Sequence, residues 1–192
     1  MIRLLLFSFL ISLLFFVNPI FSEENAEIHN ELRAFKQSLE KSFNEENIDS
    51  LVSHLHPNIV VTWQNATTTR GRENTKKYIE KLIKGPNSIV QKFKTSIDVD
   101  ELTILYGETG VSFGSSVDYL ELREGISLDL KERWSATLVK DKGKWYIASA
   151  HISVNLFDNP VLSSAKNTLY WAIPLALLIG FLIGFVFRSL KK

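Results

Sequence analysis

Cysteine is absent from the 192 residues, which excludes disulfide bonds and a lipid-modified cysteine as ways of holding or anchoring the chain. A strong charge of one sign is also missing. Apart from Arg3, Arg188, Lys191 and Lys192 near the ends, the chain has 18 basic and 21 acidic residues, a net charge of −3. This balance gives no electrostatic footprint for nucleic acid. Glycine-rich nucleotide-binding motifs are missing too, so we expect no cofactor.

Long apolar runs are present at both ends of the chain. The first run, from Leu4 to Val17, follows Arg3 and precedes acidic residues, which is the layout of a secretory signal that ends near Ser22. We therefore expect residues 1–22 to form a signal peptide. An uncleaved anchor is the alternative, because Ile20 stands where a small residue is more common.

The second apolar run, residues 169–187, contains 19 residues without a charge. As a helix it would be about 28 Å long, which is enough to cross a bilayer core of about 30 Å. The basic residues in 188–192 follow at once, and such flanks stay in the cytoplasm. We therefore predict a single-pass membrane protein with residues 158–168 as a tether, its globular domain outside the cytoplasm and its C-terminus inside. Gly180 and Gly184 form a GxxxG motif that permits close helix pairing.

Residues 23–157 between these runs have the length of one domain. Its first part is helical: apolar residues recur at helical spacing from Ile28 to Phe43, and shorter helices are expected over residues 47–54 and 73–83. Residues 58–65 read as a strand, followed by a turn. Four further strand-length stretches follow at residues 93–108, 110–125, 126–143 and 144–157. Helices followed by a run of strands predict an α+β fold with helices packed on one face of an antiparallel sheet.

Several short motifs occur along the domain in this order: Asn47-Ile48-Asp49-Ser50-Leu51, Pro57-Asn58-Ile59-Val60-Val61, Arg70-Gly71-Arg72-Glu73, Gly143-Lys144-Trp145 and His151-Ile152-Ser153. Their order and spacing resemble the nuclear transport factor 2-like superfamily, in particular its SnoaL-like members and the kinase II association domain. The resemblance covers residues 26–156. It implies a cone-shaped, curved antiparallel sheet wrapped around the N-terminal helices, with a pocket between them.

Members of this superfamily range from isomerases, dehydratases and cyclases to pure binding and assembly modules, so the fold does not give the function. Steroid isomerase-like members use an Asp base with a Tyr/Asp pair, and this trio cannot be placed on the chain. His56 stands near a position where many members carry an acidic residue. His54 and His56 lack the spacing of metal ligands, so we expect no metal site.

The last strand supplies candidate site residues. Strict alternation places Trp145, His151 and Ser153 on one face, and this face mixes an aromatic ring with polar groups as a pocket wall does. We predict that these three residues line a ligand pocket together with Trp63, Tyr78 and Trp134. The opposite face is apolar throughout, and the resemblance implies that it pairs two copies in a homodimer. Its residues are Tyr146, Ala148, Ala150, Ile152 and Val154.

These observations predict a membrane-tethered, extracytoplasmic module that binds a small apolar or amphipathic molecule or serves assembly. The alternative is an isomerase, dehydratase or cyclase that uses His151 as acid and base. His151 is equally explained as a hydrogen-bonded structural residue. Ser153 lacks the G-x-S-x-G context of a nucleophile.

Overall fold

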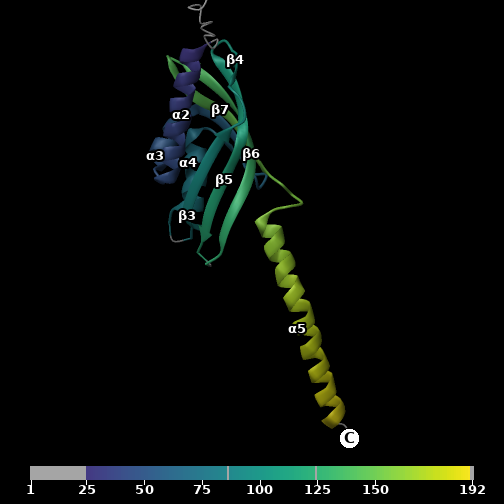
Figure 1. Cartoon of the computed structure of the whole chain (residues 1–192). Coiled ribbons are helices and arrows are strands. Elements are labelled where there is room, and N and C mark those ends of the chain that lie inside the picture. The colour runs from purple at the N-terminus through teal and green to yellow at the C-terminus, as the bar shows by residue number, and fades with distance from the viewer. Residues whose placement is uncertain (1–24, 86, 124, 191–192) are drawn as a thin grey trace, which may run out of the picture.

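A computed structural model describes residues 25–85, 87–123 and 125–190. The predicted signal peptide, residues 1–22, and the last two basic residues lie outside this range. The elements follow each other in this order: α2 (Ala26–Asn44), α3 (Ile48–Ser53), β1 (Leu55–Thr62), β2 (Thr68–Arg70), α4 (Arg72–Ile83), β3 (Val90–Val99), β4 (Ile104–Tyr106), β5 (Thr109–Leu122), β6 (Ser127–Asp141), β7 (Lys144–Val154) and α5 (Pro160–Leu190). The α+β prediction is confirmed: helices α2 to α4 lie against one face of a single sheet (Figure 1).

The helices form where apolar residues recur with helical period. The stripe predicted from Ile28 to Phe43 lies on α2, and its Leu32 is buried against the core. The Asn47 side chain accepts a hydrogen bond from the backbone N–H of Ser50 at 3.0 Å, which satisfies one of the free donors at the start of α3. The most deeply buried large side chains include Ile48 of α3 and Ile59 of β1, so the core lies where these helices meet the sheet.

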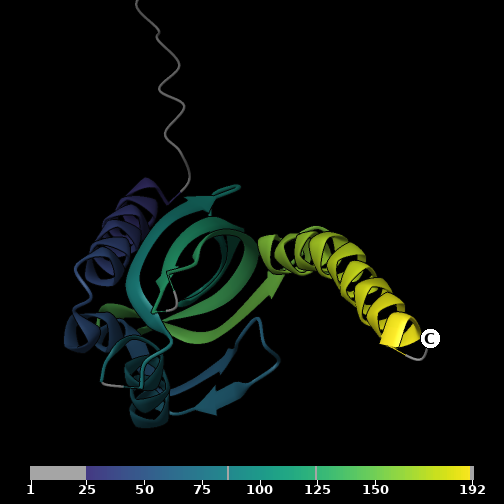
Figure 2. The same ribbon diagram turned by 90° about the horizontal axis from the view of Figure 1, so that it is seen from below.

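The sheet has the strand order β2-β1-β7-β6-β5-β3, with β4 paired to β5. Every pair is antiparallel except β1 and β7, which run parallel, so the expectation of a purely antiparallel sheet is corrected to a mixed sheet. A parallel pair needs a long connection, and nearly the whole domain lies between these two strands. Seen from below, the long strands curve into an arc whose hollow side faces the helices (Figure 2).

Two details differ from the predicted elements. The stretch 93–108 is two strands, β3 and β4, because residues 100–103 leave the ladder. Residues 68–70, expected within a turn, form the short strand β2, which pairs with residues 60–62 of β1. Strand β2 is an edge strand of the sheet, and β4 pairs with β5 beside the end of β3.

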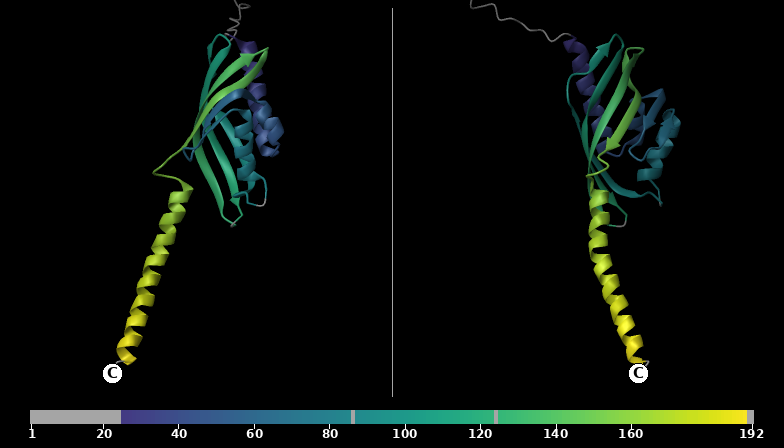
Figure 3. Two further views of the ribbon diagram at one scale, coloured as in Figure 1. Left: turned by 180° about the vertical axis from the view of Figure 1, so that it is seen from behind. Right: turned by 90° about the vertical axis from the view of Figure 1, so that its right-hand side faces the viewer.

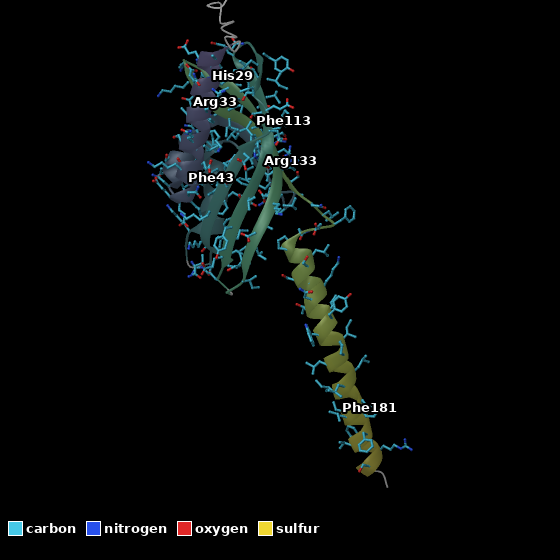
Figure 4. All side chains as sticks on the ribbon, in the orientation of Figure 1. His29, Arg33, Phe43, Phe113, Arg133 and Phe181 are labelled. Atoms are coloured by element: carbon cyan, nitrogen blue, oxygen red, sulfur yellow. The ribbon has the colours of Figure 1, made fainter. Side chains whose placement is uncertain are left out.

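Helix α5 stands apart from the α+β domain. It begins at Pro160, so most of the predicted tether is part of the helix, and its first turn is capped by Asn159, whose side-chain oxygen accepts from the N–H of Leu162 at 2.9 Å. Its apolar side chains are exposed, with Phe181 standing out from the helix (Figure 4). By length and composition, α5 is able to cross a membrane.

The domain is elongated along the strands and has two ends, which differ in the segments that they carry (Figure 1). The near end carries residues 84–85 and 87–89, between α4 and β3, and residues 123 and 125–126 of the β5–β6 connection (Figure 1). The far end carries β4 and the start of α2. Helix α5 leaves the domain in the direction of the near end (Figures 1 and 3).

Candidate functional site

A cavity of about 760 Å³ lies between the hollow face of the sheet and helices α2 and α4. Its wall is predominantly apolar and includes Leu51, Val61, Ile79 and Leu138 from the core. Small-molecule sites in proteins typically measure about 300 to 1,000 Å³ and combine an apolar wall with a few polar groups. The size and lining of this cavity therefore match one small ligand.

Four polar residues gather on the sheet side of the cavity wall. Thr95 of β3 pairs with Asp118 of β5, and Ser116 of β5 pairs with Glu132 of β6. Side chains of directly paired residues share one face of a sheet, and residues two apart on a strand do the same. All four consequently point to the hollow face and line the cavity. Thr95, Ser116 and Glu132 are buried, and Glu132 is only 4% exposed.

The two carboxyl groups of this cluster share a hydrogen bond and perturb each other. Burial, followed by the charge of Asp118 and the hydrogen bond to it, raises the pKa of Glu132 from 4.5 to about 8, while a hydrogen bond from Ser116 opposes the shift. Burial also raises the pKa of Asp118, and hydrogen bonds donated by Thr95 (2.6 Å) and by Glu132 lower it in part. Glu132 therefore holds a proton at neutral pH and donates it toward Asp118.

Two buried polar atoms that line this cavity have no hydrogen-bond partner within the described residues. They are Oε1 of Glu132 on the sheet and Nδ1 of His29 on α2, whose position near the far end is shown in Figure 4. No other buried side-chain nitrogen or oxygen in residues 25–85, 87–123 and 125–190 is left in this state. A buried polar atom without a partner costs about 1–3 kcal/mol, so it marks a position where a ligand atom would be stabilising.

Aromatic rings complete the wall. Trp63 and Tyr78 stack with ring centres 4.8 Å apart, and Nδ2 of Asn65 donates to the Tyr78 hydroxyl at 3.0 Å. On the sheet, Trp134 donates from Nε1 to the carbonyl of Ser115 at 3.0 Å, and its ring lies against Gly114, which has no side chain to displace it. Large rings held by their own hydrogen bonds form a stiff apolar surface.

The structure brings together three of the six predicted pocket residues. Trp63, Tyr78 and Trp134 line the cavity. Trp145 instead packs in the core beneath α2, where its Nε1 donates to Glu31 at 2.9 Å. His151 and Ser153 are exposed and are not among the residues that line the cavity. Their expected position in the pocket is therefore corrected.

A β-bulge at Ala148 is the physical reason for this correction. Ile147 pairs with Leu138 of β6, but Ser149 pairs with Thr137, so Ala148 is an extra residue and the alternation of β7 inverts there. Before the bulge, Trp145 and Ile147 point inward. After it, Ala150 and Ile152 point inward and line the cavity, whereas His151 turns outward. Strict alternation, as assumed from the sequence, holds only on each side of the bulge.

The same bulge divides the predicted dimer face. Tyr146 lies outside the cavity lining, whereas Ala150 and Ile152 line it, so the five residues do not form one continuous outer surface. The cross-strand pairing places Val154 opposite Glu132, on the same side as Ile152. A homodimer stays a prediction, but an apolar stripe of these five residues does not support it.

Sequence reasoning missed Asp118 and Glu132. One feature of the sequence indicated this part of the site: small or polar residues occupy every second position of one strand, at Ser112, Gly114, Ser116 and Asp118. Such a face has few large side chains to fill a core, so it leaves room for a cavity. Within the part of the chain that the structure describes, no group of three or more His, Cys, Asp or Glu residues could hold a metal ion.

Comparison with curated proteins gives no match. Among solved structures, a candidate calcium/calmodulin-dependent protein kinase II association domain from Xanthomonas campestris is 20% identical, with a TM-score of 0.54 over 66% of this chain and 86% of that one. A ketosteroid isomerase-like protein from Erwinia carotovora atroseptica is 13% identical, with a TM-score of 0.59 over 70% and 98%. An NTF-2 like protein of unknown function from Shewanella oneidensis is 13% identical, with a TM-score of 0.53 over 65% and 97%.

These likenesses establish the fold, because their identities are too low to carry an activity. The sequence itself matches the SnoaL-like domain over residues 32–156, nearly all of the α+β domain. The match spans both the helices and the strands that enclose the cavity. The chain belongs to the SnoaL-like domain family.

Proposed function

We propose that the domain binds one small, largely apolar molecule that carries a hydroxyl or carbonyl group, and that this group contacts Glu132. The observation that carries the proposal is the unpartnered Oε1 of Glu132, a buried oxygen that lines the cavity. Glu132 donates its proton to Asp118 through its other oxygen, so Oε1 has free lone pairs and accepts from a ligand hydroxyl. A ligand carbonyl would bind here by taking this proton in place of Asp118.

The surroundings of Glu132 define the ligand further. The apolar wall favours a ligand with a hydrocarbon body, because burying apolar surface contributes about 25 cal/mol per Å². Asp118 and Glu132 together hold one proton between two carboxyl groups at neutral pH, so the pair has a residual negative charge. A ligand with its own anionic group beside the pair is disfavoured by like-charge repulsion. An uncharged oxygen group is therefore the best match.

Native mass spectrometry of the full chain tests this function. Wild-type protein should carry an added small-molecule mass. Ala136→Phe should lose it, because Ala136 lines the cavity and a benzyl group there occupies the ligand space. Thr137→Phe is the matched control: its side chain is on the opposite face of the same strand, hydrogen-bonded by Ser149 at 3.1 Å, and the bound mass should remain. Equal retention by both variants would contradict binding in the cavity.

We further propose that α5 tethers the domain to a membrane, with the domain outside the cytoplasm and Arg188 on the cytoplasmic side. The support is the length of α5, its exposed apolar side chains and the basic residue that follows them. Because the chain has no cysteine, a single introduced cysteine reports on which side of the membrane its position lies. A membrane-impermeant maleimide should label Ser127→Cys in intact host cells, and should label Ser189→Cys only after permeabilisation. The opposite pattern would invert the topology.

A second function, acid–base catalysis, is favoured by the carboxyl pair. A protonated Glu132 beside Asp118 is able to give a proton to a substrate while Asp118 accepts one, the exchange that an isomerisation needs. A ketosteroid isomerase-like protein is among the similar structures. Under this proposal, Glu132→Gln should abolish turnover while the bound mass remains. His151→Ala should leave turnover unchanged, because His151 is outside the cavity lining.

A further inference from the structure

The two ends of the cavity differ in polarity. At the far end the wall includes charged and polar residues, His29 and Arg33 from α2 (Figure 4) and Asp98 and Glu101 from the end of β3 and the segment after it. Two apolar lining residues there, Val99 and Leu102, are 40% and 48% exposed. At the near end the wall is apolar, and it consists of Leu82, Ile83, Ile89, Val90, Leu120 and Leu122. The polar cluster around Glu132 lies between these two ends. The near half is thus an apolar passage that leads to a protonated carboxyl group.

The rim of the near end carries two exposed apolar residues. Ile89, which lines the cavity, is 61% exposed, and Ile126 of the β5–β6 connection is 45% exposed. Arg123 of the β5–β6 connection holds the α4–β3 connection in place. Its guanidinium donates to the carbonyl of Ser88 at 2.8 Å and to that of Gly85 at 3.0 Å. Because Ile89 is both exposed and part of the lining, the apolar wall of the cavity reaches the protein surface at this end, the near mouth of the cavity.

The position of α5 determines which end of the cavity would face a membrane. Residues 155–159 alone join β7 to α5, and five extended residues span roughly 17 Å. Residues 160–168 add about 14 Å of helix before the apolar run begins. Because α5 leaves toward the near end (Figure 3), a bilayer around residues 169–187 would lie on the side of the mouth. The far end would point away from it.

We propose that the ligand is a single-chain lipid with an uncharged hydroxyl or carbonyl end, taken directly from the bilayer through the near end of the cavity. The oxygen group contacts Glu132 and the chain lies along the apolar passage past Leu120 and Val90. This inference rests on the proposed function and on α5 crossing a membrane. A cavity of about 760 Å³ is in the range for one compact ligand, not for a two-chain phospholipid.

Photolabelling of the full chain in phosphatidylcholine nanodiscs tests the inference. Two probes are used: a diazirine-bearing hexadecanol, which resides in the bilayer, and a diazirine-bearing hexanol, which reaches the protein from water. Trypsin separates the relevant segments, because residues 85–92 and 95–123 form two cavity peptides and residues 167–188 form one peptide from α5. The α5 peptide contacts lipid in any case, so its label is an internal reference. Hexadecanol should label both cavity peptides in addition.

Matched variants locate the passage. Ile89→Asp introduces a charge at the apolar mouth, and hexadecanol labelling of the cavity peptides should be lost. Ile104→Asp makes the same change at an exposed isoleucine of β4, at the far end and outside the cavity lining, and should change nothing. Circular dichroism checks that both variants are folded, and Ile89→Ser is a milder second substitution that should give an intermediate loss.

The two probes separate the failure of this inference from the failure of the proposed function. If hexanol labels the cavity peptides and hexadecanol labels only residues 167–188, the cavity binds small molecules but the bilayer route is wrong. If neither probe labels the cavity peptides, the proposed function is overturned as well. Equal hexadecanol labelling in Ile89→Asp and wild type would overturn the near end as the mouth.

Discussion

Glu132 donates a hydrogen bond to Asp118 on the neighbouring strand, inside a cavity whose wall is otherwise mainly apolar. The proton that joins these two carboxyl groups is held because burial penalises the second negative charge. The pair lies on the sheet side of the cavity wall, and several of the properties that we expect to measure follow from it.

The pair should make the folded domain less stable as the pH rises. The folded state holds the Glu132 proton up to about pH 8, whereas an unfolded chain loses it near pH 4.5. Between these values the folded state binds more protons than the unfolded one, so the free energy of unfolding falls with pH, by up to about 1.4 kcal/mol per pH unit. Its contribution is complete below pH 4.5 and is lost by pH 8. Asp118, whose pKa is also raised, acts in the same direction.

Glu132→Gln isolates this effect. The amide has the shape of the protonated acid but does not titrate, so the melting temperature of the variant should depend on pH from 5 to 8 much less than that of wild type. At pH 8 the variant should be more stable than wild type. Thermal unfolding followed by circular dichroism measures both. A variant that loses stability with pH as steeply as wild type would show that another group carries the dependence.

Gly114 should tolerate no side chain. A Cβ atom there would meet the carbonyl oxygen of Asp98 at a distance that real structures do not show, and would lie 2.8 Å from Cζ2 of Trp134. We expect Gly114→Ala to lower the free energy of unfolding by about 1–3 kcal/mol through overpacking and to displace Trp134 from the cavity wall. Gly180→Ala, which adds a methyl group in open space on α5, is the control and should cause no loss in denaturation experiments.

His151 should be dispensable for ligand binding. It is exposed and does not line the cavity, so His151→Ala should keep the bound mass in native mass spectrometry. Trp134→Ala, which removes a ring from the wall, should weaken retention severalfold. If the histidine variant lost the ligand while the tryptophan variant kept it, the placement of the site on the hollow face would be wrong.

Arg123 should control the mobility of the cavity mouth. Its guanidinium donates to two carbonyls and to the Ser88 hydroxyl, at 2.8 Å from Nη2, and so joins residues 85–88 to the end of β5. Arg123→Ala should speed amide hydrogen exchange in residues 85–90 severalfold. Arg123→Lys should restore it only in part, because an ammonium cannot donate in this forked pattern. Arg133→Ala, which breaks an exposed ion pair with Asp100, should leave residues 85–90 unchanged.

The sequence predicted those features that depend on local periodicity. The apolar stripe that includes Leu32 predicted α2, and the uncharged run up to Phe187 predicted the C-terminal helix. Trp63, Tyr78 and Trp134, predicted as pocket residues from other elements than the last strand, line the cavity.

What the sequence did not predict depends on pairing between distant residues. The extra residue at Ala148 is visible only from the register of β7 against β6, and it turns His151 outward and Ile152 inward. The parallel pairing of β1 with β7 likewise depends on which strands meet across the sheet. Asp118 and Glu132 are ordinary acidic residues along the chain. They become a pair only because β5 and β6 place Ser116 opposite Glu132.

The most direct test is the carboxyl titration of Glu132, measured by ¹³C NMR on the full chain in nanodiscs, with and without hexanol. We predict a midpoint near pH 8 that falls when hexanol is present, because a ligand hydroxyl that donates to Oε1 stabilises the ionised carboxylate more than the neutral acid. Glu132→Gln assigns the signal by removing it. A midpoint near 4.5 that does not respond to hexanol would contradict both the protonated pair and its contact with a ligand.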